Sequence, residues 1–78
     1  MALDNEQKKA ILQQMLDGTE TEIFRQEAEL AALNAEADAV KGADMQQMHQ
    51  NNIDNVSAGI ARLRARQGAW QSQLDAIK

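Results

Sequence analysis

The chain has 78 residues, a net charge of −4 at pH 7, no cysteine and no proline. A chain of this length forms one domain at most, and the lack of cysteine excludes disulfides and thiolate metal sites. The negative charge argues against a nucleic-acid binder, because such domains usually carry a basic patch. Ala, Gln, Glu and Leu are abundant, and since all four are good helix formers, we expect an all-α protein.

The first ten residues predict the start of a helix. Asp4 and Gln7 have the spacing of a capping box, and Glu6 is an acid in the first turn. Residues 1–5 end in the polar pair Asp4 and Asn5, and no apolar core of a signal peptide follows them. No stretch approaches the roughly 18–20 apolar residues that span a bilayer. We therefore expect no membrane contact and a cytoplasmic or virion-associated location.

Residues 5–41 carry a heptad row in alternating steps of four and three, which is typical of a helix that packs along one partner helix. The row consists of Leu12, Leu16, Thr19, Ile23, Gln26, Leu30, Leu33, Ala37 and Val40. Gly18 leaves two interpretations open. It could end a short first helix, giving three helices in all, or lie inside one long helix. The row keeps its phase across Gly18, which favours the long helix.

The segment Lys41-Gly42-Ala43-Asp44 predicts a turn between two helices. A second heptad row follows it: Gln46, His49, Ile53, Val56, Ile60, Leu63, Gln67, Trp70, Leu74 and Ile77. One unbroken helix would need a phase jump of two residues between the rows, whereas coiled coils slip by three or four. Gly42 suits a helix end, and Asp44 with Gln47 suits a capping box. The expected fold is one long antiparallel helical hairpin, with arms at about 5–41 and 45–77 and a turn at about 42–44.

If the chain reverses at this turn, each residue of the first heptad row faces a residue of the second row, and their two residue numbers add up to 86. Polar residues within such a row fix the alignment of two helices at some cost in stability. Exposed ion pairs beside the row contribute only about 0–1 kcal/mol each. The three pairs that we expect to set the register are Thr19 with Gln67, Glu20 with Arg64, and Glu22 with Arg66.

The outer faces of the two arms carry small residues at helical spacing. Phe24 lies one position beyond Ile23 of the heptad row, so we expect it to point outward. Alanine on a solvated face is also simply the best helix former, but two such stripes beside an exposed phenylalanine favour a packing surface. The expected partner interface consists of Phe24, Ala28, Ala31, Ala35, Ala58, Ala61 and Ala65.

No constellation of catalytic, metal-binding or cofactor-binding residues stands out. His49 is the only histidine, and the chain offers it no cysteine or second histidine as a co-ligand. Arg62, Arg64 and Arg66 form the densest basic run, but alternate residues spread around a helix and do not line one face. We therefore expect no enzyme, no cofactor and no metal site.

The leading hypothesis is a non-enzymatic structural or interaction protein, a helical hairpin that forms an oligomer or docks onto a larger protein assembly. A small accessory protein or virion component of a phage or virus fits this description. The first alternative is a regulator or inhibitor that binds one protein target through its acidic arm, since residues 1–39 hold nine acids and three bases. The second alternative is a nucleic-acid-associated factor that uses the arginine run, although the net charge favours a protein partner over nucleic acid.

Overall fold

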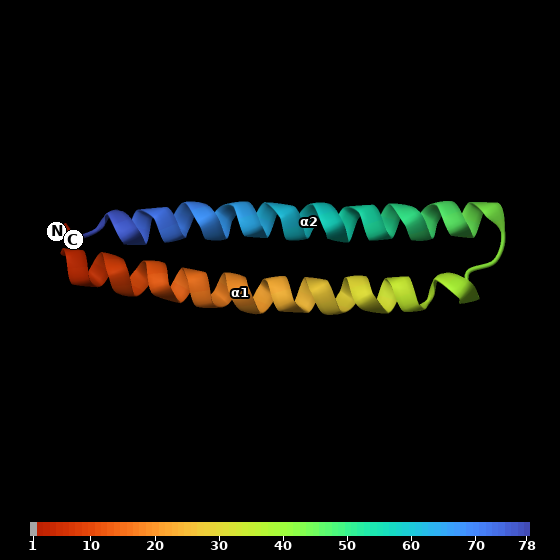
Figure 1. Ribbon diagram of the computed structural model, residues 1–78, viewed down its shortest axis with the longest axis horizontal. Helices are drawn as coiled ribbons and strands as arrows, with labels where there is room; N and C mark the ends of the chain where they lie inside the picture. The colour runs from red at the N-terminus through yellow and green to blue at the C-terminus, as the bar shows by residue number, and fades with distance from the viewer. Residues whose placement is uncertain (1) are drawn as a thin grey trace.

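The computed structural model describes residues 2–78, which form a long helical hairpin (Figure 1). Helix α1 spans Asn5–Ala35, a short 3₁₀ helix η1 spans Ala37–Ala39, and helix α2 spans Ala43–Ala76. The rod measures 58 × 20 × 15 Å. The all-α hairpin that the heptad rows predict is therefore confirmed.

Helix α1 begins and continues as the sequence predicts. The N–H of Gln7 donates to Asp4 Oδ1 at 2.8 Å, and the N–H of Asp4 donates to Gln7 Oε1 at 3.0 Å, which completes the capping box. The helix then passes through Gly18 without a break. A glycine costs a helix only about 1 kcal/mol, so the packing on either side of Gly18 keeps one long helix.

The turn lies earlier in the chain than the sequence predicts. Helix α1 ends at Ala35 instead of near residue 41, and Gly42 rather than Asp44 is the N-cap of α2. Gly42 has a φ of 87°, and no side chain caps α2. The predicted capping box of Asp44 and Gln47 is therefore wrong. Asp44 instead lies in the first turn of α2, where a carboxylate is favourable to the helix dipole.

The short helix η1 accounts for the early end of α1. A 3₁₀ helix has about 3.0 residues per turn instead of 3.6, so the heptad row loses its phase there. Ala37 is exposed as a result, while Val40 stays half-buried. Residues 40–42 then cross to α2, and three extended residues span about 10 Å, which matches the usual 8–10 Å between the axes of packed helices.

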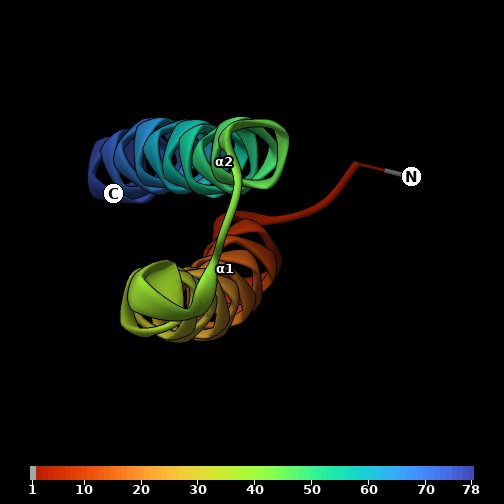
Figure 2. The same ribbon diagram turned by 90° about the vertical axis from the view of Figure 1, so that its right-hand side faces the viewer.

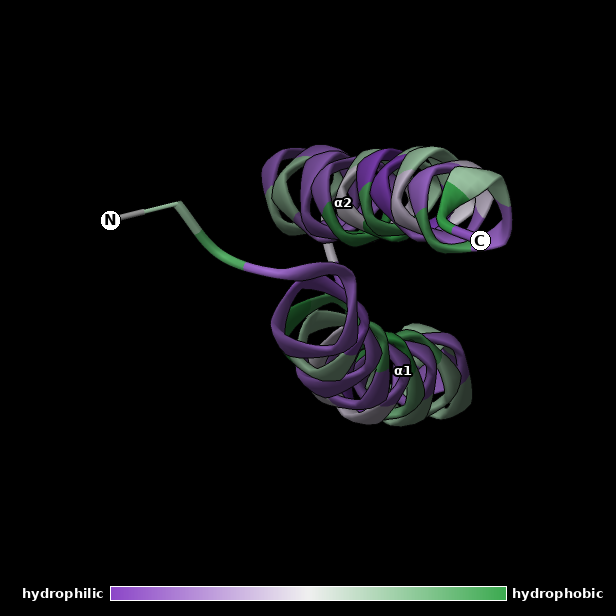
Figure 3. Ribbon diagram, turned by 90° about the vertical axis from the view of Figure 1, so that its left-hand side faces the viewer, coloured by the Kyte–Doolittle hydropathy of each residue, from purple (hydrophilic) through white to green (hydrophobic). Residues whose placement is uncertain are grey.

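The two heptad rows meet along the rod and form its seam, the layer of side chains between α1 and α2. In the end-on view, much of the hydrophobic ribbon lies where the helices face each other (Figure 3). The buried residues of the described chain are Leu12, Leu16, Thr19, Ile23, Leu33 and Ile60. Every residue of the second heptad row from His49 to Ile77 is buried or half-buried. Within residues 2–78, however, no side chain is less than 2% exposed, so the seam is a thin core.

Ile23 and Phe24 provide a matched test of the seam. Ile23 is 6% exposed and Phe24 is 73% exposed, although they are neighbours in the chain. We expect Ile23→Ala to lower the free energy of unfolding by about 2–3 kcal/mol, because it leaves a cavity in the seam. Phe24→Ala should change it by less than about 0.5 kcal/mol. Urea denaturation at one fixed protein concentration measures both; equal losses would place Phe24 in the core.

The four glycines provide a second test. A Cβ added to Gly18, Gly59 or Gly68 meets no atom within 4 Å, so each change to alanine should stabilise its helix by about 0.5–1 kcal/mol. Gly42→Ala should instead destabilise the hairpin by about 1–3 kcal/mol, because its positive φ is strained for any residue with a Cβ. Thermal melting of the four variants checks the opposite signs; a stabilising Gly42→Ala would contradict the observed turn.

Candidate functional site

The hairpin has two broad sides, because two helices side by side leave their seam open in front and behind. Glu22 and Phe24 are two residues apart and so point about 200° apart around α1. We call one side the Phe24 side, with Glu20, Phe24, Glu27, Arg64 and Gln67. We call the other the Gly59 side, with Glu22, Gln26, Asn55, Gly59, Arg62 and Arg66.

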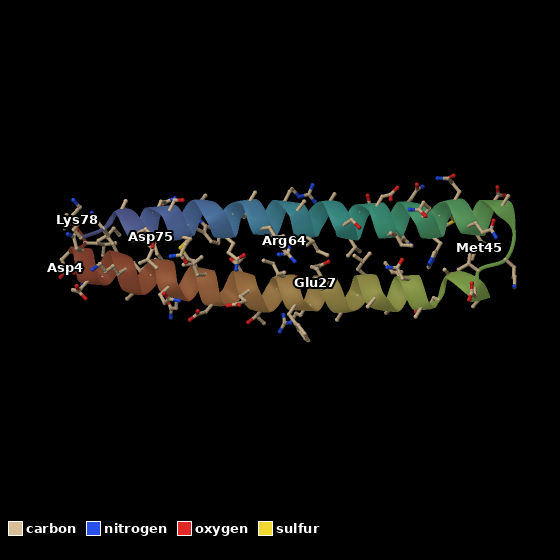
Figure 4. All side chains as sticks on the ribbon, viewed as in Figure 1. Asp4, Glu27, Met45, Arg64, Asp75 and Lys78 are labelled. Atoms are coloured by element: carbon tan, nitrogen blue, oxygen red, sulfur yellow. The ribbon has the colours of Figure 1, made fainter. Side chains whose placement is uncertain are left out.

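The Phe24 side holds the one ion pair between helices in residues 2–78. Arg64 Nη2 donates to Glu27 Oε1 at 2.8 Å, and the two side chains point toward each other across the seam (Figure 4). The expected partner of Arg64 was Glu20, which lies in the same hollow of the surface but forms no ion pair with it in the described chain. The long guanidinium side chain reaches Glu27, two turns of α1 further toward the tip than Glu20.

The other two expected register pairs, Glu22 with Arg66 and Thr19 with Gln67, are not bonded directly within residues 2–78. Glu22 and Arg66 line the same groove, but the Glu22 carboxylate accepts from Gln26 Nε2 at 3.0 Å and lies 3.7 Å from Arg25. Thr19 is buried, and its hydroxyl donates to the Met15 carbonyl of its own helix at 2.8 Å. Of these two pairs, the structure places Glu22 and Arg66 along one groove, and the hydroxyl of Thr19 is bonded within its own helix.

The Gly59 side contains two hollows. A groove of about 400 Å³ lies over the middle of the seam, where Gly59 contributes no side chain. A second, more apolar hollow of about 360 Å³ lies at the open end of the rod and is lined by Leu3, Ile11, Leu12, Ala76 and Ile77, together with Lys8 and Gln73. Lys8 of the second hollow lies two heptads before Glu22 of the groove on α1, and Gln73 lies two heptads after Gly59 on α2. Residues two heptads apart share one face of a helix, so the two hollows lie on the same side of the hairpin.

The residues of the expected alanine interface lie on both helices. Phe24 and all six alanines are exposed. Ala28 and Ala35 occupy positions of α1 that point away from α2, and Ala58 and Ala65 occupy the corresponding positions of α2. These four alanines therefore follow opposite edges of the rod, because α1 and α2 lie side by side (Figure 2).

The tip of the hairpin contains a contact that the sequence analysis missed. His49 Nε2 lies 2.8 Å from the carbonyl oxygen of Leu33, and since a carbonyl can only accept, Nε2 must carry the proton. Leu33 is one of the last four residues of α1, whose carbonyls have no N–H partner within the helix. His49 therefore caps α1 from α2. The sequence placed His49 on the seam, but the cap depends on α1 ending at Ala35.

No helix in the described part of the chain is long and apolar enough to cross a membrane. Residues 2–78 contain no group of three or more His, Asp or Glu side chains that could hold a metal ion. No protein-family model, curated protein or solved structure matches this chain.

The histidine cap can be tested with a change that keeps the ring. We expect His49→Phe to lower the free energy of unfolding by about 1 kcal/mol, because the Leu33 carbonyl loses its donor. Amide hydrogen exchange should also become faster in the last turn of α1. Gln50→Ala is the control: its side chain bonds Asp54 within α2, and its loss should cost less than about 0.5 kcal/mol. Unchanged exchange in His49→Phe would show that the cap contributes nothing.

Proposed function

We propose that this chain is a non-enzymatic interaction protein, a helical hairpin that associates with copies of itself or docks onto a larger protein assembly. The observation that carries the proposal is its surface area. The chain exposes 5825 Å², whereas a folded monomer of 8.6 kDa is expected to expose about 4,700 Å². The excess of roughly 1,100 Å² exceeds the share of about 800 Å² that each partner contributes to an ordinary protein interface.

The chemistry of the exposed surface supports a protein partner. Large apolar side chains at the surface are Leu3, Ile11, Phe24, Met45 and Met48, each between 42% and 73% exposed. Met45 lies at the tip of the rod, far from the open end (Figure 4). Apolar side chains at both ends and in the middle suit a partner that runs along the rod.

The arrangement of the arginines weakens the nucleic-acid alternative. Arg64 lies on the Phe24 side and is bonded to Glu27, while Arg62 and Arg66 line the groove of the Gly59 side. Three charges divided between two sides of a rod do not form the single basic stripe that follows a phosphate backbone.

The test is the mass of the full chain in solution. We expect light scattering after size exclusion to give a multiple of 8.6 kDa at micromolar concentration, and we expect the melting temperature to rise with protein concentration, because association stabilises the folded state. A cooperatively folding monomer with a concentration-independent melting temperature would rule out self-association. A titration with duplex DNA at 50 and 200 mM salt tests the nucleic-acid alternative, for which affinity must fall steeply with salt.

A further inference from the structure

We propose that a second copy of this chain covers the Gly59 side, with α1 of each copy lying on α2 of the other. The two copies are then related by a twofold axis parallel to the rod, and together they form a four-helix bundle in which neighbouring helices are antiparallel. This inference rests on the proposed function and names its partner, its face and its orientation.

The size of the face fits this arrangement. The broad side of the hairpin measures 58 by 20 Å in outline, and packing it against a copy leaves each helix with two neighbours instead of one. An ordinary interface takes about 800 Å² from each partner, which is less than the excess area of the lone hairpin. Because a twofold interface uses the same patch on both copies, the patch must complement itself.

The apolar residues favour the Gly59 side over the Phe24 side. Leu3 and Ile11 are 48% and 42% exposed there, and they border one hollow together with Ala76 and Ile77. On the Phe24 side, Phe24 is the one large apolar side chain with high exposure among residues 2–78, and its hollow is otherwise lined mostly by polar and charged residues. With the axis parallel to the rod, the apolar hollows of the two copies lie at the same end and cover each other.

The charges of the groove determine which helix lies on which. On the Gly59 side of α2, the charged residues are Arg62 and Arg66, and neither is in an ion pair within residues 2–78. The same side of α1 presents Glu22 at the same height of the rod, with a side chain that is 41% exposed and a carboxylate that lies 3.7 Å from Arg25 of its own helix. Laying α1 of one copy on α2 of the other brings Glu22 to the arginines of the second copy, twice in each dimer.

The opposite orientation is disfavoured by the same charges. If the copies were antiparallel, α2 would lie on α2, and the Arg62 residues of the two copies would be about 8 Å apart along the rod, since Arg62 is near the middle of α2. No acidic residue of α2 occupies the positions on this side between Asn52 and Ala76. Like charges that face each other in an interface cost several kcal/mol.

The face is tested with two variants of the full chain that each place a lysine on an exposed apolar position. Ile11→Lys lies on the Gly59 side and Phe24→Lys on the Phe24 side, and neither position is buried in the hairpin. We expect Ile11→Lys to weaken dimerisation at least tenfold and Phe24→Lys to leave it within about threefold, measured by sedimentation equilibrium. Circular dichroism checks that both variants stay helical.

The reverse result separates the two proposals. A dimer that survives Ile11→Lys and is lost in Phe24→Lys would overturn the Gly59 side as the interface and leave self-association intact. A wild-type chain that is monomeric at all accessible concentrations would overturn both the dimer and the self-association arm of the proposed function.

The orientation is tested with one spin label on each chain. Gln73 is exposed, and the chain has no native cysteine, so Gln73→Cys gives a single labelling position at the open end of the Gly59 side. The parallel bundle predicts a distance below about 25 Å between the two labels, since it is only two helices wide. The antiparallel bundle predicts about 40 Å. A distance near 40 Å in a stable dimer would overturn the proposed orientation.

Discussion

Each helix of this hairpin has only one neighbour to pack against, and this constraint limits the core to a single layer of side chains. Ile23, Leu16 and Thr19 are the best-covered residues of the seam, and even they keep 6–7% of their surface exposed. In a bundle, a second neighbour covers the flanks of such a layer. The thin seam therefore explains the large exposed area of the chain and the hollows on both sides of it.

Packing, and not pairing of charges, sets the register of the two helices. The Arg64–Glu27 ion pair joins two side chains that are 58% and 49% exposed, and pairs of this kind contribute about 0–1 kcal/mol. The hydroxyl of Thr19 donates to a carbonyl of its own helix α1. Thr19 therefore needs no hydrogen-bond partner from α2 to be buried in the seam. The alignment instead follows from the apolar rows, which extend along both helices and allow few ways of closing the turn.

The sequence predicted the seam far better than the turn. The heptad rows are periodic over many residues, so one irregular position changes little, and the half-buried row of α2 appears as expected from His49 to Ile77. The turn depended on local signals at Gly42 and Asp44, and these did not reveal that residues 37–39 form a 3₁₀ helix. That conformation reflects how the chain crosses between helices, which is a tertiary requirement. The error also concealed the cap by His49, because its acceptor is free only when α1 ends at Ala35.

The sequence predicted that the residues of the candidate interface are exposed, but it did not predict how they are distributed around the rod. Periodicity identified Phe24 and the alanines as outward-facing, and all of them are exposed. It could not show that alanines of α1 and α2 follow opposite edges, because that depends on how the helices are placed side by side. The two hollows of the Gly59 side likewise depend on residues from both helices.

The contacts at the two ends of the rod join residues that are very differently separated in the sequence. This difference affects the order in which the hairpin folds. The contact of His49 with Leu33 joins residues 16 positions apart, whereas Asn5 Nδ2 donates to the Lys78 carbonyl across 73 positions. Closing a short loop costs less chain entropy than closing a long one. The hairpin should therefore close from its tip toward its ends, so that residues near the turn control the folding rate and residues near the termini control the unfolding rate. Formation of the tip would then be the slow step for a rod whose best-buried side chains, such as Leu16 and Ile23, lie further along the seam.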